Sequence, residues 1–89
     1  MKVGYTVQLW REGDQYIAHA MPLDVVSSGP TPAKARAALA EAVDLFLKTA
    51  QEAGTLDQVL EETGYTRGVR GWLSPKWLKT EKAAALVAV

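Results

Sequence analysis

Alternating apolar and polar residues at the start of the chain predict a β-hairpin. In KVGYTVQLW, Tyr5, Val7 and Leu9 fall on one face of an extended chain, and a period of two is typical of a strand. The Gly13-Asp14 pair that follows is a two-residue hairpin signal. QYIAHA, residues 15–20, would then return as the second strand.

The position of this turn also sets the pairing of the two strands. With the turn at 13–14, counting outward places Trp10 opposite Ile17 and Gln8 opposite His19. One face of the hairpin is small and apolar, which suits a covering helix, and it would carry Val7, Leu9, Ala18 and Ala20. The other face is mixed, and it would carry Thr6, Gln8, Trp10, Ile17 and His19.

A third strand and a long helix follow. Pro22 ends the second strand, and DVVSSG indicates a short third strand that stops at Gly29. Thr31 is a good helix N-cap and Pro32 suits the first helical position. Apolar residues then recur at helical spacing up to Gly54, the expected helix stop. This stripe consists of Ala35, Leu39, Ala42, Val43, Phe46 and Ala50.

The sequence pattern of residues 55–89 predicts shorter elements. Thr55 with Gln58 three residues later forms a capping-box pattern, and Gly64 would close a short second helix. The glycines and proline between 65 and 82 argue against a long regular element. AAALVAV could be a helical end or a strand. We favour a strand after Lys82, because a three-stranded sheet would otherwise keep an exposed edge.

These elements predict an α+β fold, in the order β-β-β-α-α-β. A three- to four-stranded, mainly antiparallel sheet would carry one long helix on one face, with a short second helix beside it. We expect residues 1–65 to form the α/β domain. Residues 66–89 would be a C-terminal extension that packs on the same domain or on a neighbouring subunit and ends in a strand.

The composition of the chain excludes several classes of protein. The chain has 89 residues, enough for one domain, and 48% of them are hydrophobic, which excludes a disordered tail. Ten basic and ten acidic residues cancel. The absence of cysteine excludes disulfides and thiol chemistry, and a single histidine leaves few zinc ligands. No run is apolar enough for a signal peptide or a membrane span. A soluble, cytoplasmic protein without a cofactor is therefore expected.

Candidate catalytic groups are few. His19 lacks a cysteine partner or a serine in a nucleophile-elbow pattern. The acidic residues near strand ends, Glu12, Asp14 and Asp24, form no convergent set for a metal. We therefore predict a protein that is not an enzyme and holds no metal, with His19 in a structural or interfacial role.

Aromatic residues are the better candidates for function. Trp10, Ile17 and His19 share a sheet face that no helix is predicted to cover. One interpretation is that this face contacts a protein partner. The other is that the chain after Tyr65 folds over it, and the sequence does not favour either interpretation. Trp72 and Trp77 in the extension resemble packing anchors. Together these five residues predict a partner or oligomer interface, with a homodimer or homotetramer as the expected assembly.

The extension is also basic. Cations interleaved with aromatic residues can bind single-stranded nucleic acid, and the candidates here are Arg67, Arg70, Lys76 and Lys79. The competing interpretation pairs this segment with acidic residues of the helices. These residues are Glu41, Asp44, Glu52, Glu61 and Glu62.

The ordered set of elements resembles the HicB-like antitoxin family from about Val3 to Tyr65. The resemblance is carried by the hairpin YTVQLWREGDQYIAHAMP, by the strand-Gly-x-Thr-helix junction at Gly29 and Thr31, and by AGTLDQVLEETGY. It implies a partial RNase H-like unit. It also implies a partner, a small basic HicA-type ribonuclease toxin with a double-stranded-RNA-binding fold. The segment MPLDVVSSG is shorter than in many members and lacks their Pro-Gly pair.

The resemblance makes an antitoxin-like binding protein the first expectation. Many members carry a C-terminal DNA-binding domain, for which no room is expected after Tyr65, so DNA binding by this chain is doubtful. The alternative is a stand-alone oligomeric regulatory or structural protein without a toxin, binding RNA through its basic extension. A degenerate RNase H-like enzyme ranks last, because the carboxylate cluster it would need for magnesium is missing.

Overall fold

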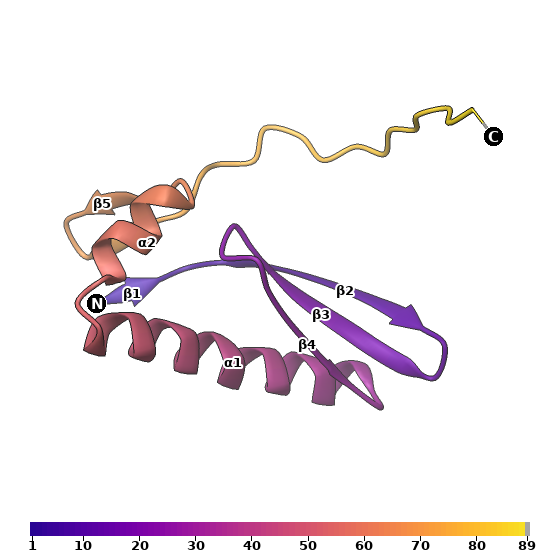
Figure 1. Ribbon diagram of the computed structural model, residues 1–89, viewed down its shortest axis with the longest axis horizontal. Coiled ribbons are helices and arrows are strands. Elements are labelled where there is room, and N and C mark those ends of the chain that lie inside the picture. The colour runs from indigo at the N-terminus through magenta and orange to yellow at the C-terminus, as the bar shows by residue number, and fades with distance from the viewer. Residues whose placement is uncertain (89) are drawn as a thin grey trace.

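Two helices and two small sheets form an α+β architecture in the computed structural model, which describes residues 1–88 (Figure 1). The predicted α+β class is confirmed, although the strands form two three-stranded sheets, ordered β2-β3-β4 and β1-β6-β5. The elements are β1 (Lys2–Val3), β2 (Thr6–Glu12), β3 (Gln15–Met21), β4 (Val25–Gly29), α1 (Pro32–Glu52), α2 (Leu56–Glu62), β5 (Thr66–Gly68) and β6 (Gly71–Leu73).

The β2-β3-β4 sheet is antiparallel throughout, and the register predicted for its hairpin is confirmed. Trp10 pairs with Ile17, Gln8 with His19, and Glu12 with Gln15 at the turn. Gly13 has a φ of 60°, the left-handed value that a type II′ turn needs at its first central residue. β4 then returns alongside β3.

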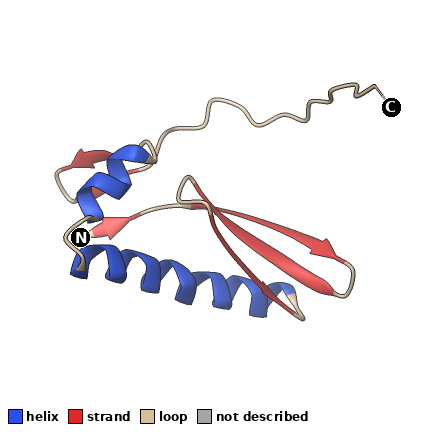
Figure 2. Ribbon diagram, in the orientation of Figure 1, coloured by secondary structure: helices blue, strands red, loops and turns tan. Residues whose placement is uncertain are grey.

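α1 lies along one face of this sheet (Figure 2), and buried residues of α1 and the sheet form the core. The Oγ1 atom of Thr31 accepts a hydrogen bond of 3.1 Å from the Lys34 backbone N–H, so the predicted N-cap is confirmed. From the predicted stripe, Ala35, Leu39, Val43 and Ala50 are buried. Their small and branched side chains meet the equally small Ala18 and Ala20 of β3, which are fully buried.

α2 begins after the left-handed Gly54 and ends before the left-handed Gly64, as the two glycines predicted. The predicted capping box is wrong. Thr55 makes no side-chain cap bond, because its hydroxyl donates instead to the Ala50 carbonyl at 3.4 Å. Gln58 bonds to Glu62 at 3.0 Å, one helical turn further on.

The second sheet ties the C-terminal third of the chain to the N-terminus. β6 runs parallel to β1 and antiparallel to β5. The Tyr65 hydroxyl donates to the Gly4 carbonyl at 2.5 Å, across 61 positions of the sequence. Burial, followed by repulsion from nearby Tyr5, raises the pKa of Tyr65 above its ordinary value of 10.0.

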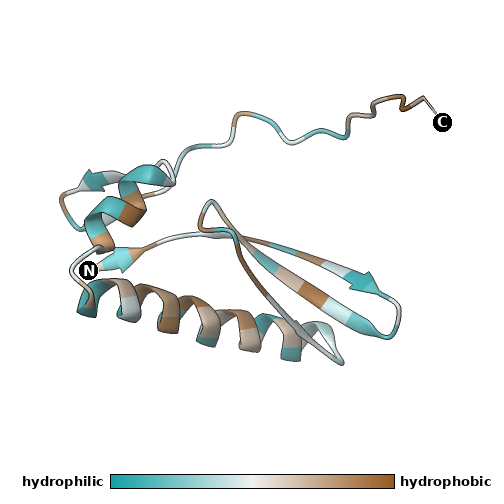
Figure 3. Cartoon of the chain, viewed as in Figure 1, coloured by the Kyte–Doolittle hydropathy of each residue, from teal (hydrophilic) through white to brown (hydrophobic). Residues whose placement is uncertain are grey.

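The strand predicted after Lys82 is wrong for residues 83–88. Residues 74–88, called the tail below, form neither helix nor strand, and the C-terminal end of the tail leads away from the body of the molecule (Figure 1). The end of the tail is hydrophobic (Figure 3), yet Leu86 and Val87 are exposed. Alanine is a weak strand former, and β6 already occupies the place beside β1. Within residues 1–88 no helix has the length and hydrophobicity that crossing a membrane requires.

Candidate binding surface

The face of the β2-β3-β4 sheet opposite α1 is the candidate site, and it is called the outer face below. The register places on it Thr6, Gln8, Trp10, Ile17, His19, Met21, Val26 and Ser28. Trp10 is 40% exposed and Val26 is 56% exposed. Two large apolar side chains exposed on the same sheet face make this face a candidate for contact with another molecule.

His19 lies at the centre of the outer face and is held from both sides. Its Nε2 atom is 2.6 Å from Oδ1 of Asp24, and its Nδ1 atom is 3.5 Å from Oε1 of Gln8. The ring also meets Trp10 edge-on, with centroids 6.2 Å apart and planes at 77°. These contacts fix the orientation of the imidazole.

Asp24, the partner of His19, comes from the turn between β3 and β4. Its φ is 61°, a left-handed conformation that aspartate tolerates better than most residues. Its backbone N–H donates to the Ala20 carbonyl at 2.8 Å. This tight turn brings the carboxylate back over the strand that carries His19. The sequence put Asp24 among metal candidates and missed this contact.

The His19–Asp24 pair resembles the base and orienting acid of a hydrolase, but its surroundings do not complete such a site. A nucleophile must lie within hydrogen-bond reach of the base. In residues 1–88 the ring nitrogens of His19 contact Asp24 and Gln8 and no hydroxyl. The carboxylate of Asp24, at the tip of the pair, is exposed.

Trp10 and Trp77 have their indole nitrogens paired within the chain. Nε1 of Trp10 donates to Glu12 at 3.0 Å, and Nε1 of Trp77 donates to the Thr6 hydroxyl at 3.1 Å. Trp77 thereby places the start of the tail against the outer face, where a hollow of about 440 Å³ separates tail from sheet. The tail covers one end of the outer face, and Trp10 and Val26 remain exposed.

Trp72, grouped with the interface residues from the sequence, is 4% exposed and belongs to the core. The guanidinium of Arg67 covers its ring at 4.9 Å. Trp72 is therefore closed to a partner in this structure. The sequence held no signal for this difference, because Trp72 and Trp77 have similar neighbours and only the pairing of β6 with β1 separates them.

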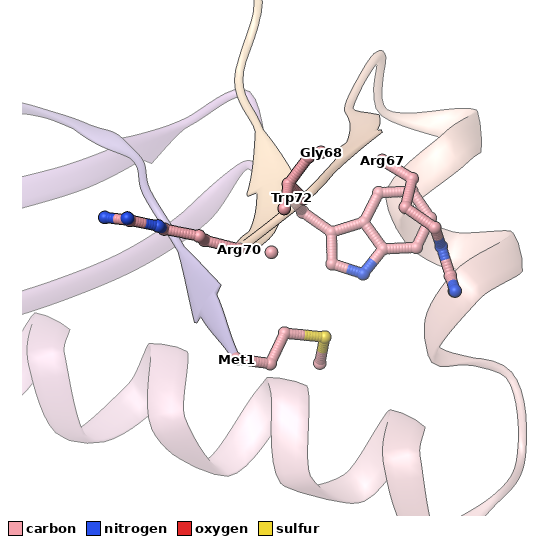
Figure 4. Close-up of a pocket in the computed structure, with 7 residues that line it drawn as sticks. Met1, Arg67, Gly68, Arg70 and Trp72 are labelled. Carbon is pink, nitrogen blue, oxygen red and sulfur yellow. The ribbon is translucent and has the colours of Figure 1, made fainter.

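The basic residues do not converge on a nucleic-acid site. Arg67 pairs with Asp57 at 2.6 Å and Lys79 with Glu81 at 3.3 Å. A pocket of about 370 Å³ has Arg67, Arg70 and Trp72 in its lining. Figure 4 shows the Arg70 side chain directed away from Trp72 and Arg67. The side chains of Arg67 and Arg70 therefore point apart in this structure (Figure 4), and the remaining candidate, Lys76, lies exposed in the tail.

The acidic residues near strand ends also stay apart. No three histidine, cysteine or acidic side chains within residues 1–88 come close enough to share a metal ion. Comparison with known proteins adds no assignment, since no family model, curated protein or solved structure matches the chain.

Proposed function

We propose that this protein is an antitoxin-like binding protein that neutralises a small, basic HicA-type ribonuclease by direct contact through its outer face. The observation that carries the proposal is the part of the outer face that the tail leaves open, where Trp10 and Val26 are exposed on either side of an oriented His19. Aromatic residues are enriched where protein interfaces lose water, and a few such residues carry most of the binding energy.

Charge supports a basic partner. Glu12 and Asp24 stand at the margin of the outer face, and both are exposed. Carboxylates placed around an apolar patch attract a cationic protein and orient it during encounter. The proposed identity of the partner rests on the resemblance to HicB-like antitoxins, and the exposed apolar and acidic residues of the outer face support contact with a basic protein.

Contact with protein is favoured over contact with RNA. Arg67 and Lys79 are already neutralised within the chain by Asp57 and Glu81, so fewer cations are free to displace counterions from a nucleic acid. We expect no retention of single-stranded RNA in a filter-binding assay, even at low salt. Retention that weakens as salt is added would support the RNA-binding alternative.

Co-expression with the protein of the neighbouring open reading frame tests the proposal, which expects that protein to be a HicA-type toxin. Wild-type protein should rescue growth and co-purify with the toxin. Trp10→Glu and Val26→Glu should abolish both effects, because each replaces an exposed apolar side chain of the outer face with a charge. Leu45→Glu is the matched control, since Leu45 is an exposed apolar residue of α1.

The growth of these variants decides whether the outer face contacts the toxin. Rescue by Trp10→Glu and Val26→Glu at wild-type level would exclude the outer face as the contact surface. If only Leu45→Glu lost rescue, the toxin would contact the side of the molecule that carries α1 and not the outer face. A toxin that neither binds nor is neutralised by the wild-type chain would refute the antitoxin function itself.

A further inference from the structure

Strand β2 has a partner on one side only. It pairs with β3, and within residues 1–88 its other edge bonds to no strand. The other edge strand, β4, is protected: it is five residues long and is preceded by Pro22 and followed directly by Pro30. β2 has seven residues and contains no proline. Short edges and prolines prevent strands from pairing with other chains, and β2 has neither safeguard.

β2 also exposes apolar residues on both of its faces. Val7 points to the helix side and is 37% exposed, and Trp10 points to the outer face. Val7 is open because α1 packs mainly on β3 and β4 and only touches β2. The sheet therefore extends past its helix at this edge. Apolar residues on both faces are typical of a strand inside a wider sheet.

The hairpin determines which backbone groups of β2 point outward. Residues that flank a two-residue turn exchange both of their hydrogen bonds, and bonded and non-bonded pairs alternate from there. Glu12 and Gln15 flank the turn, so Trp10 and Gln8 also direct their backbone groups toward β3. The N–H and C=O groups of Val7, Leu9 and Arg11 therefore face the free edge.

We propose that two copies of this chain pair through this edge, with their β2 strands antiparallel and Leu9 opposite Leu9 of the second copy. Only residues with outward groups can bond to one another, which restricts the register. Leu9 is the middle residue of Thr6–Glu12, so this register overlaps the whole strand. Arg11 then lies opposite Val7 of the second copy, and no like charges oppose each other.

The pairing joins two three-stranded sheets into one of six strands, with both α1 helices on the same side. On the outer face Trp10 lies opposite Gln8 of the second copy, and the two Trp10 side chains become diagonal neighbours. The dimer forms from this chain alone and does not depend on the proposed toxin, so either proposal can fail without the other.

Sedimentation velocity with two variants of Val7 tests the pairing. The wild-type chain should sediment as a dimer that dissociates on dilution. Val7→Pro removes an outward N–H from each copy without touching the β2–β3 ladder, and proline is tolerated at such edge positions. We expect it to raise the dimer dissociation constant at least about tenfold. Val7→Ala keeps the N–H and should remain dimeric.

Cysteine cross-linking tests the register and does not depend on Val7→Pro folding. The chain has no cysteine, so each single substitution supplies the only thiol. Leu9→Cys would place two Cα atoms about 5.5 Å apart across a bonded pair, within disulfide reach. In Val7→Cys the two thiols would be offset by roughly 13 Å along the strands, so mild oxidation should link the first variant and not the second.

Three results would each overturn the proposal. The first is a wild-type chain that is monomeric at every concentration. The second is a folded Val7→Pro variant that dimerises as tightly as Val7→Ala. The third is a Val7→Cys variant that cross-links as readily as Leu9→Cys.

Discussion

The close approach of β4 to the start of α1 makes Gly29→Ala a sharp test of how the sheet and helix fit together. A Cβ atom at position 29 would lie 2.7 Å from the backbone nitrogen of Ala35 and 2.9 Å from the carbonyl carbon of Lys34. Both atoms belong to the main chain of the first helical turns, so neither can rotate aside. Relief requires α1 and β4 to separate, which loosens the packing of Ala35 and Leu39.

Overpacking of this kind typically costs about 1–3 kcal/mol. We expect Gly29→Ala to lie near the upper end, at about 2–3 kcal/mol, because both clashing atoms are backbone atoms. In a domain of this size each kcal/mol lowers the melting temperature by about 4–8 °C, so the variant should melt roughly 10 °C or more below wild type.

Urea unfolding followed by far-ultraviolet circular dichroism, at one fixed protein concentration, measures this cost. Gly4→Ala is the matched control: a Cβ there meets nothing within 4 Å, and its φ is not left-handed. The control should stay within about 0.5 kcal/mol of wild type. A Gly29→Ala variant with the wild-type midpoint, or an equal loss in Gly4→Ala, would refute this account of the sheet–helix contact.

Three further substitutions test other parts of the fold. Thr31→Ala removes the N-cap bond to Lys34 and should cost about 1 kcal/mol in urea unfolding, whereas Thr31→Ser should recover most of it. Trp72→Ala empties a core position and should cost about 3–5 kcal/mol; a loss below about 1 kcal/mol would contradict its burial. Tyr65→Phe tests the buried phenol, whose pKa is raised above 10.0, chiefly by burial. The folded state keeps this proton at pH values where the unfolded chain releases it, so wild-type stability should be complete below about pH 10 and fall above it. Tyr65→Phe should fall less steeply over that range, and equal slopes would contradict the assignment.

The β2–β3 hairpin and α1 could be predicted because their signals are local. The turn at 13–14 fixes the whole register by counting, and Thr31 with Pro32 marks the helix start within one residue. The second sheet could not be predicted in the same way. Strands of two or three residues are too short to show a period of two, and the β1–β6 pairing joins opposite ends of the chain.

The sequence predicted which residues share the outer face, but it did not predict their contacts or their burial. The alternating pattern placed Trp10, Ile17 and His19 on one face, which the register confirms. It could not reveal that Asp24 would reach His19, because that contact depends on a left-handed turn at a non-glycine residue. It also could not separate the buried Trp72 from the more exposed Trp77, since their burial depends on long-range pairing.

The most direct test of the proposed function is the affinity of the purified chain for a HicA-type toxin, taken from the neighbouring open reading frame if that frame encodes one, measured by isothermal titration calorimetry. We expect wild-type protein to bind, and Trp10→Ala to lose about 2 kcal/mol or more, as a central aromatic contact does. That loss corresponds to roughly a thirtyfold weaker dissociation constant. Wild-type protein that does not bind the toxin, or Trp10→Ala that binds with unchanged affinity, would contradict the proposal that the outer face holds the toxin.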